Sequence, residues 1–316
     1  MPQPGNTTVI VNPRARGGQL GRRFESLRGV IVKALGPVDF RFTERRGHAA
    51  ELTQEAVERG VSTLVSFGGD GTHSEVASSI AELGAGDAVG LGILNAGTGG
   101  DFRKMLEGSR SLESACRTIA ETDPTPVDLA RITHLDLDGT ESSRHFINIT
   151  TAGIGGLVDH YVNHAAFRLG GRLDYALATL RAHLHYRPTH LRVIVDGASL
   201  GEYELLVACA CNGQIAGGGM RFAPSARLAD GLLDVVLIEA RSLLRLLPLS
   251  PRIYSGTHLN APGVHHTRGR RIEFIPLDEA RPAFLDIDGE EAGFGPASIE
   301  VIPHAIRVHG PRREVL

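Results

Sequence analysis

The string Gly68-Gly69-Asp70-Gly71-Thr72 constrains the fold of this chain most strongly, because it lies between a strand-like and a helix-like segment. Residues 61–67 are β-branched and apolar, which is typical of a parallel strand buried on both faces. From 74 to 83 the apolar residues recur at roughly helical spacing. The glycines therefore fall at the carboxyl end of a strand, where backbone N–H groups and a helix N-terminus can hold phosphate. An ordinary glycine-rich turn is the alternative interpretation of this string alone.

Length and charge narrow the class of protein. A chain of 316 residues favours two domains, and a net charge of -3 argues against nucleic acid as the main partner. The amino terminus has no basic region, and no apolar run reaches the roughly 18 residues of a membrane-spanning helix. We therefore expect a cytoplasmic protein. Its cysteines have no CxxC spacing and are predicted to be buried reduced thiols; they are Cys116, Cys209 and Cys211.

The pattern of segments changes near residue 130. Up to that point strand-like and helix-like stretches alternate, which is the signature of a parallel sheet built from βαβ units. We predict an α/β domain over 1–130 and a second, mainly antiparallel β domain over 131–303. The first domain should hold strands at 8–11, 38–42, 64–67 and 90–94 and helices at 24–35, 49–59 and 74–83. The second should hold strands at 127–132, 145–150, 191–195, 203–211, 233–238, 271–275 and 283–287, with a helical insertion at about 169–185.

The segment 241–254 mixes leucines with arginines and is interrupted by two prolines. A short basic amphipathic element of this kind can rest on anionic lipid. A surface helix whose arginines extend along apolar side chains explains the same pattern.

A second glycine-rich corner follows the first after one βα unit. The strand-like 90–94 leads into 95–102, and successive βα loops of a parallel sheet open on the same edge. Asp70, Thr72, Thr98 and Asp101 would then line a cleft suited to a nucleotide and its metal. Asn12, followed by Gly17 and Gly18, is a weaker candidate for a contact with the base or ribose, and taken alone a simple turn explains it better.

In the second domain Asp286, Asp288 and Glu290 alternate around Gly289. On one strand this spacing would place all the carboxylates on one face, where crowding favours a proton-accepting role. A solvated Asp-Gly hairpin turn is the alternative. Phosphoryl transfer to a hydroxyl needs such a carboxylate, Mg²⁺ and N–H donors around the γ-phosphate.

With these motifs in this order, the chain resembles the diacylglycerol kinase catalytic-domain family, which includes sphingosine and ceramide kinases. The resemblance runs almost from end to end. Its motifs are Val11-Asn12-Pro13, Thr43 with Gly47-His48-Ala49, Gly68 to Thr72, Cys211-Asn212-Gly213 with Gly217 to Met220, Ala223-Pro224, Asp230 to Asp234, and Asp288-Gly289-Glu290. Because NAD kinases share the Gly68–Thr72 string, the later motifs carry the distinction.

The resemblance implies residue roles. ATP contacts are expected at Thr43, at Thr98 and along the run Gly68, Gly69, Asp70, Gly71, Thr72, His73 and Ser74. Glu290 is the expected proton acceptor, with Asp288 and Asp101 as further catalytic residues. Mg²⁺ is expected near Asp230, with backbone carbonyls around Arg227 and Leu232. The family also implies an NAD kinase-like first domain, a β-sandwich lipid domain, a cleft between them, and a tail from about 304 that returns to the first domain.

One stretch departs from the family pattern. The second loop of the family usually reads proline, a residue or two, then Gly-Thr-Gly-Asn-Asp. Here Asn95 stands at the proline and Gly100 at the asparagine, while Asp101 is retained. A flexible glycine at 100 would loosen the loop.

These observations predict an ATP- and Mg²⁺-dependent lipid kinase that makes phosphatidic acid from diacylglycerol. The lipid would be met at the membrane surface by peripheral association, and a homodimer is left open. A sphingoid base is the nearest alternative acceptor. NAD kinase is a second alternative, because Asn95 resembles the corresponding loop of those enzymes, although no convincing Asn-Glu recognition motif of theirs is found. A catalytically silent nucleotide- or lipid-binding regulator is the third.

Overall fold

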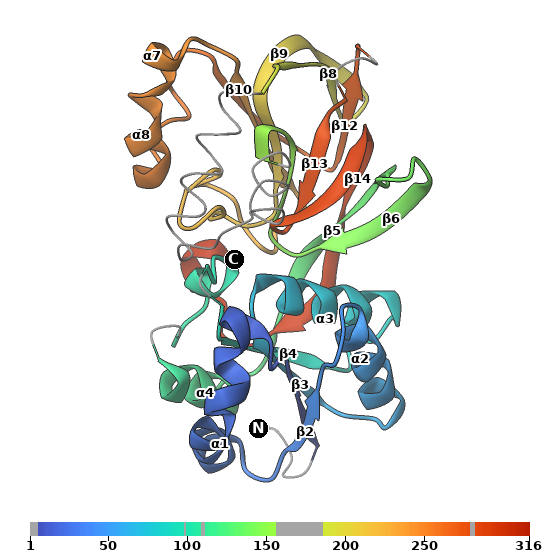
Figure 1. Ribbon diagram of the computed structural model, residues 1–316, viewed down its shortest axis with the longest axis vertical. Helices are drawn as coiled ribbons and strands as arrows, with labels where there is room; N and C mark the ends of the chain where they lie inside the picture. Colours follow the sequence, from blue (N-terminus) through green and yellow to red (C-terminus); the bar gives the residue numbers. More distant parts are fainter. Residues whose placement is uncertain (1–5, 98, 109–110, 156–185, 279–281) are drawn as a thin grey trace. The chain divides into compact units, whose positions relative to one another are not determined.

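The computed structural model describes residues 6–97, 99–108, 111–155, 186–278 and 282–316, and the chain divides into two compact units (Figure 1). The first unit comprises Met1–Leu129, Leu228–Asp230 and Ile302–Leu316, and the second comprises Ala130–Arg227 and Gly231–Val301. The sequence-based boundaries near 130 and 303 did not separate residues 228–230 from the second domain. Thr98 and the helix expected at 169–185 lie outside the described residues.

A parallel sheet forms the centre of the first unit. Its strands are β1 (Thr7–Val11), β2 (Asp39–Phe42), β3 (Thr63–Gly68), β4 (Gly90–Asn95) and the end of β14 (Glu290–Val308). They pair in the order β2, β1, β3, β4, β14, and each of these pairs is parallel. The central strands β1, β3 and β4 are almost entirely buried because helices cover both faces of the sheet.

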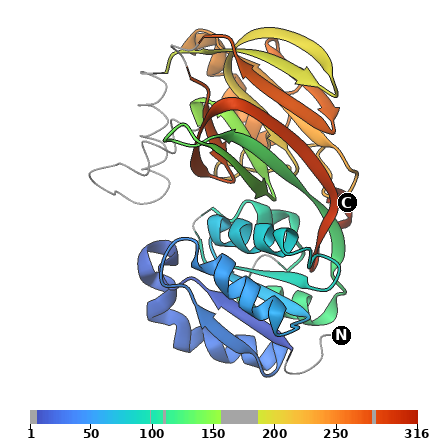
Figure 2. The same cartoon turned by 90° about the vertical axis from the view of Figure 1, so that its right-hand side faces the viewer.

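Two pairs of helices cover this sheet. They are α1 (Ala15–Leu35) with α4 (Leu112–Glu121), and α2 (His48–Glu58) with α3 (Asp70–Glu82). The pairs lie on opposite faces, and α2 and α3 are in front of the sheet in Figure 2. Helix α1 begins earlier than the sequence predicts, across a kink at 16–18, and α3 begins at Asp70 rather than Ser74. Helix α4 was not predicted; Ser111 and Ser114 form its capping box.

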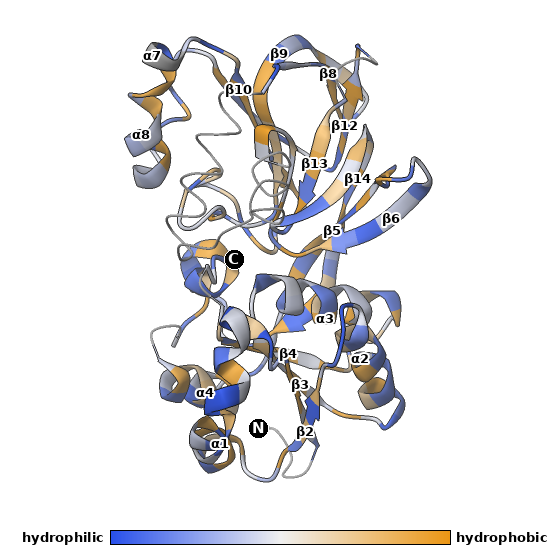
Figure 3. Ribbon diagram, in the orientation of Figure 1, coloured by the Kyte–Doolittle hydropathy of each residue, from blue (hydrophilic) through white to orange (hydrophobic). Residues whose placement is uncertain are grey.

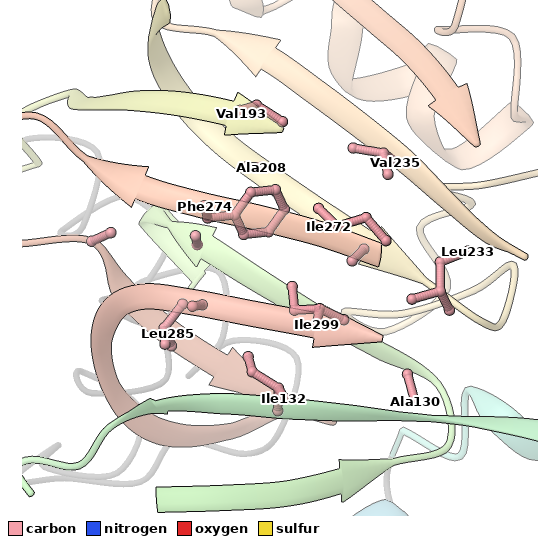
Figure 4. Close-up of a cluster of buried hydrophobic side chains, with 14 of the residues drawn as sticks. Ala130, Ile132, Val193, Ala208, Leu233, Val235, Ile272, Phe274, Leu285 and Ile299 are labelled. Carbon is pink, nitrogen blue, oxygen red and sulfur yellow. The ribbon is translucent and has the colours of Figure 1, made fainter. Parts of the chain in front are cut away.

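Antiparallel strands build the second unit. They are β6 (Glu141–Phe146), β7 (Ile149–Gly153), β8 (Thr189–Val195), β9 (Ala198–Cys211), β10 (Leu233–Glu239), β11 (Val264–Gly269), β12 (Arg271–Pro276) and β13 (Phe284–Ile287), with parts of β5 (Thr125–Leu135) and β14. Hydrophobic residues recur along these strands (Figure 3). Ile132 of β5, Ile272 and Phe274 of β12, Leu285 of β13 and Ile299 of β14 point into one core (Figure 4).

Short elements complete the described structure. They are the 3-10 helices η1 (Phe102–Met105) and η2 (Arg313–Val315) and the helices α7 (Leu243–Leu246) and α8 (Leu249–Ser255). The basic segment 241–254 therefore forms two short helices rather than one. Among the described residues, no helix has the length and apolar character needed to cross a membrane.

Two predictions about strands were wrong. The strand expected at 145–150 is interrupted, because β6 ends at Phe146 and β7 starts at Ile149. His265 and His266, which the predicted strands leave out, lie in β11 opposite Leu237 and Val236 of β10. Alternating polar side chains on a sheet edge are hard to distinguish from a loop by composition, because polarity dominates both.

Candidate functional site

The first glycine-rich loop is short because β3 ends at Gly68 and α3 begins at Asp70. A Cβ atom at Gly68 would lie 2.6 Å from the Thr72 hydroxyl oxygen, so the corner requires glycine there. That hydroxyl also accepts a hydrogen bond of 3.0 Å from the Asn12 side-chain amide. The loop after β1 and the first turn of α3 are thus joined directly.

The second glycine-rich loop contacts the first through the backbone. The Gly68 carbonyl accepts hydrogen bonds from the amides of Ala96 at 2.6 Å and Gly97 at 3.1 Å. A Cβ atom at Gly97 would lie 2.9 Å from the Cα atom of Gly69. The loops meet because β3 and β4 are parallel neighbours whose carboxyl ends share one edge of the sheet.

The Asp70 carboxylate connects the same two loops. Its Oδ2 atom accepts a hydrogen bond of 2.8 Å from the amide of Gly100. Asp70 also stands in the first turn of α3, where a carboxylate is stabilised by the helix dipole. The first amide groups of a helix have no acceptor within the helix, so this corner offers N–H donors to an anion.

Three other predicted nucleotide contacts have less exposed positions. Thr43 is buried after β2, and its amide donates to the Val11 carbonyl at 2.9 Å. The His73 side chain is 1% exposed, and burial lowers its pKa to about 4, so its ring is neutral and turned away from solvent. Ser74 is half-buried in the first turn of α3.

Asp101 lies at the N-cap of η1 and is buried. Its Oδ1 atom forms an ion pair with the ammonium group of Lys104. The pair places one carboxylate and one cation directly after the second loop. Sequence reasoning named Asp101 and missed Lys104, although the i, i+3 spacing was a usable signal.

A cavity of about 250 Å³ adjoins the second loop in the first unit. Asn95, Ala96 and Gly97 line it together with Arg16, Arg103 and residues of α4. None of the first-loop residues lines this cavity. It therefore lies beside the second loop, with two arginines in its wall.

The carboxylates of the second unit do not alternate along one strand. Asp288 and Gly289 have φ values of 52° and 84° and form the two-residue turn between β13 and β14. Glu290 therefore faces Ile287 on the neighbouring strand, and Asp286 faces Glu291. The prediction of one crowded face was wrong, because an Asp-Gly pair with positive φ reverses the chain.

The Asp-Gly turn of the alternative interpretation is present, but it is solvated only in part, because Gly289 is exposed and Asp288 is not. Asp288 is buried, and its carboxylate accepts hydrogen bonds from the backbone amides of Ile147, Asn148 and Ile149 at 2.9 to 3.0 Å. These bonds hold the interruption between β6 and β7. Asn212 binds the same segment, donating from its side chain to the Ile147 carbonyl at 2.8 Å. Two motifs far apart in the sequence therefore meet here.

Glu290 follows this anchored turn. Its Oε2 atom lies 3.2 Å from Nη2 of Arg144 on β6, and the two side chains are 33% and 37% exposed. The carboxylate is thus reachable from solvent while one oxygen is held. Arg144 was missed by sequence reasoning, since nothing in a polar stretch between 141 and 145 distinguishes it from its neighbours.

The predicted metal residues lie where the chain passes between the units. Asp230 belongs to the first unit, and Arg227 and Leu232 belong to the second. Within the described part of the chain, no cluster of three or more His, Cys, Asp or Glu side chains is arranged to hold a metal ion.

Asp234 is the last residue of the same motif, and its contacts join elements of the second unit. It is buried and contacts the Ser225 hydroxyl at 2.8 Å, His266 Nε2 at 2.7 Å and Arg268 Nε at 3.1 Å. These partners connect β10 to β11 and the preceding loop. We therefore interpret Asp234 as an anchor of the second unit.

Comparisons with known proteins agree over nearly the whole chain. Residues 6–132 match the model of the diacylglycerol kinase catalytic domain, and residues 148–310 match that of the YegS C-terminal NAD kinase beta sandwich-like domain. The diacylglycerol kinase of Mycobacterium tuberculosis (strain H37Rv) is 31% identical over 265 residues, which cover 84% of this chain and 82% of that protein.

Two further likenesses cover more of the chain. A protein of Serratia proteamaculans named "Probable lipid kinase YegS-like" is 29% identical over 98% of this chain and 96% of its own length. A crystal structure described as that of "a putative diacylglycerol kinase from Bacillus anthracis str. Sterne" superposes with a TM-score of 0.77 at 22% identity, over 98% of this chain and 96% of the other. The last likeness shows a shared fold.

Proposed function

This chain belongs to the diacylglycerol kinase catalytic-domain family of lipid kinases, and we propose that it transfers the γ-phosphate of ATP to the hydroxyl group of diacylglycerol, forming phosphatidic acid. The observation that carries the proposal is the direct joining of two glycine-rich loops at the Gly68 carbonyl. This joining holds the second loop against the corner where α3 begins, and the N-terminus of a helix favours an anion.

The first unit supplies the nucleotide side of the reaction. Close approach of Gly69 and Gly97 leaves backbone where side chains would otherwise block phosphate oxygens. Asn12 and Thr72, already bonded to each other, stand at the same strand edge. Asp70 ties the two loops together, so the donors are fixed before ATP binds and less ordering is required on binding.

The residues fit a magnesium ion by the chemistry of their donors. Asp230 offers a carboxylate, and the carbonyl oxygens of Arg227 and Leu232 would complete a set of hard oxygen ligands. When bound with ATP, Mg²⁺ neutralises phosphate charge. Asp70 and Asp101 are the carboxylates proposed to order the phosphates and their metal.

The second unit supplies the acceptor side. In the proposed step the lipid hydroxyl oxygen forms a bond to the γ-phosphorus, the bond from that phosphorus to the β–γ bridging oxygen breaks, and ADP leaves. The hydroxyl proton passes to the Glu290 carboxylate. Arg144 orients that carboxylate by holding one oxygen, and Asp288 positions the turn that carries it.

The substitution Glu290→Gln tests this assignment. It keeps the shape of the side chain and removes the proton acceptor, so diacylglycerol phosphorylation at saturating ATP should fall by roughly 100-fold or more. The matched control is Glu291→Gln, the same change on the adjacent residue, which should retain activity. Undiminished turnover in folded Glu290→Gln protein would contradict the proposed role.

The acceptor is identified by offering alternatives together. Purified protein with labelled ATP would be given diacylglycerol, a sphingoid base and NAD, and each product would be identified by mass. Label on phosphatidic acid supports the proposal. Label only on NAD would indicate NAD kinase, and ATP binding without transfer would indicate the silent regulator. Loss of transfer in Asp70→Ala protein would exclude that regulator.

We further propose that the protein meets its lipid by peripheral contact with the membrane. In the described part of α7 and α8 and the turn between them, Leu247 and Tyr254 are 60% and 51% exposed, and Arg245 is exposed beside them. Apolar side chains next to arginine suit an anionic bilayer. Leu247→Glu should weaken sedimentation with anionic vesicles and leave turnover in detergent micelles unchanged. Equal sedimentation of both proteins would contradict this proposal.

A further inference from the structure

Asn95 and Gly100, the positions at which the second loop departs from the family pattern, lie against each other. Asn95 ends β4 opposite Gly68, and its side-chain amide donates a 3.1 Å hydrogen bond to the Gly97 carbonyl. This bond spans the start of the loop and fixes the orientation of the Gly97 peptide. A proline at 95 has no side-chain donor with which to make it.

Gly100 occupies the space that the Asn95 side chain leaves. Its φ is 61°, a conformation that favours glycine. A Cβ atom there would lie 2.8 Å from both Cγ and Nδ2 of Asn95 and 2.5 Å from Nε of Arg103. With Asn95 present, a side chain at 100 therefore forces the loop to move. The two departures are sterically linked.

His73 supports Asn95 from α3. Its Nδ1 atom lies 2.8 Å from the hydroxyl of Ser66 on β3, so both side chains are held between sheet and helix. Within the described structure, neither His73 Nε2 nor Asn95 Oδ1 has a hydrogen bond of normal geometry. The two side chains nevertheless interact, since Asn95 partly offsets the effect of burial on the pKa of His73.

We propose that Asn95 is the positioning residue of the second glycine-rich loop: supported by His73, it binds the Gly97 carbonyl, so that the Gly97 amide is held against the Gly68 carbonyl of the first loop, and it contributes to the requirement for glycine at position 100. The two departures from the family pattern, asparagine at 95 and glycine at 100, therefore depend on each other. The loop is fixed by the Asn95 side chain and is not loosened by Gly100. The proposal rests on the proposed function only in assigning ATP to this loop.

A double-mutant cycle tests the linkage. Gly100→Ala should raise the dissociation constant of ATP about tenfold in the otherwise native chain, a coupling typical of residues in contact. In the Asn95→Ala background the same change should raise it by a clearly smaller factor, because the contact with Asn95 is gone while the contact with Arg103 is present in both backgrounds. The strain of φ 61° is present in both backgrounds and cancels. Equal effects of Gly100→Ala in the two backgrounds would overturn the proposal.

Two further measurements separate positioning from stability. Asn95→Ala and His73→Gln should each raise the KM for ATP several-fold, because the loop that binds ATP is displaced. The kcat should change less. Asn95→Asp, which keeps an oxygen but loses the N–H donor to Gly97, should behave like Asn95→Ala. Gly29→Ala is the control, because a Cβ atom on that helical glycine meets nothing within 4 Å. Unchanged KM in folded Asn95→Ala protein would also overturn the proposal.

The same double-mutant cycle is repeated without nucleotide. The measured quantity is then the urea concentration at the midpoint of unfolding. Coupling between positions 95 and 100 should appear there as well. If the native protein binds no ATP, the proposed function fails, while coupling in unfolding still supports the steric linkage. If ATP binds and no coupling appears in either measurement, the positioning role of Asn95 fails alone.

Discussion

The glycine-rich loops of the first unit and the Asp288 turn of the second unit fix backbone in opposite ways. At Gly68 and Gly97 the backbone is held because side chains are absent, and added Cβ atoms would lie 2.6 and 2.9 Å from neighbouring atoms. At Asp288 it is held because one side chain is present and accepts bonds from three amides. In the second unit this arrangement leaves the neighbouring Glu290 side chain 33% exposed.

The difference predicts where each region tolerates change. At Gly68 and Gly97 the limit is space, so an added Cβ atom is harmful there. The turn is limited by charge and hydrogen bonding, so an isosteric change at Asp288 is harmful although no space is lost. The substitutions below test that contrast, beginning with the largest expected effect.

Asp288→Asn should have the largest effect on stability. The amide keeps the volume of the carboxylate but presents an N–H₂ group to backbone N–H donors, which should cost about 3 kcal/mol of unfolding free energy. Urea unfolding measures it. Asp138→Asn is the control, since Asp138 is exposed and accepts from Thr140 in a surface turn. A loss at Asp288 no greater than at Asp138 would show that the buried bonds do not hold the turn.

Gly68→Ala should lower the free energy of unfolding less than Asp288→Asn does. It should weaken ATP binding more. The added methyl group meets Thr72, whose hydroxyl is already bound to Asn12, so relief requires a shift of the loop. We expect about 2 kcal/mol of lost unfolding free energy, as for overpacking elsewhere. ATP binding, measured by calorimetry, should become undetectable. Native affinity in this variant would mean that the first loop does not hold the nucleotide.

His73 predicts a pH dependence of stability. Its pKa is lowered by burial to about 4, below the ordinary value of 6.5, so the unfolded chain binds more protons between these values. Stability from this histidine is therefore complete above pH 6.5 and is lost as the pH falls toward 4, by at most about 1.4 kcal/mol per pH unit. His73→Gln should reduce this slope by up to about 1.4 kcal/mol per pH unit, which is the contribution of one proton. Burial also lowers the pKa of His134, His258 and His309, which remain in both proteins.

Arg144→Gln should have the smallest effect on stability. The pair with Glu290 is partly exposed and screened, so we expect less than about 1 kcal/mol. Turnover should still fall several-fold, because the Glu290 carboxylate loses the group that orients it. Arg192→Gln, which breaks a comparably exposed pair with Glu202, serves as control and should leave turnover intact. Parallel losses in the two variants would argue against an orienting role.

Some of the site followed from local sequence, and some did not. The corner at Gly68 was predictable, because a β-branched run, paired glycines and a helical period are all local signals, and β3 and α3 lie there. Contact between the first and second loops followed from the order of βα units. The role of Asp288 did not, since its partners at 147–149 lie about 140 residues away. Arg144, Lys104 and helix α4 were missed for want of a distinctive pattern.

The sequence by itself determined where the backbone carries no side chain and where strands change to helices, because these features depend on covalent geometry and local periodicity. It also indicated the lipid kinase family through the order of its motifs. Only the tertiary structure decided which side chains face the solvent. It turned His73 inward and engaged Asp288 with amides from a distant segment. It also placed Asn95 in the space beside Gly100. These outcomes depend on contacts between residues that are not neighbours in the chain, and no local pattern encodes them.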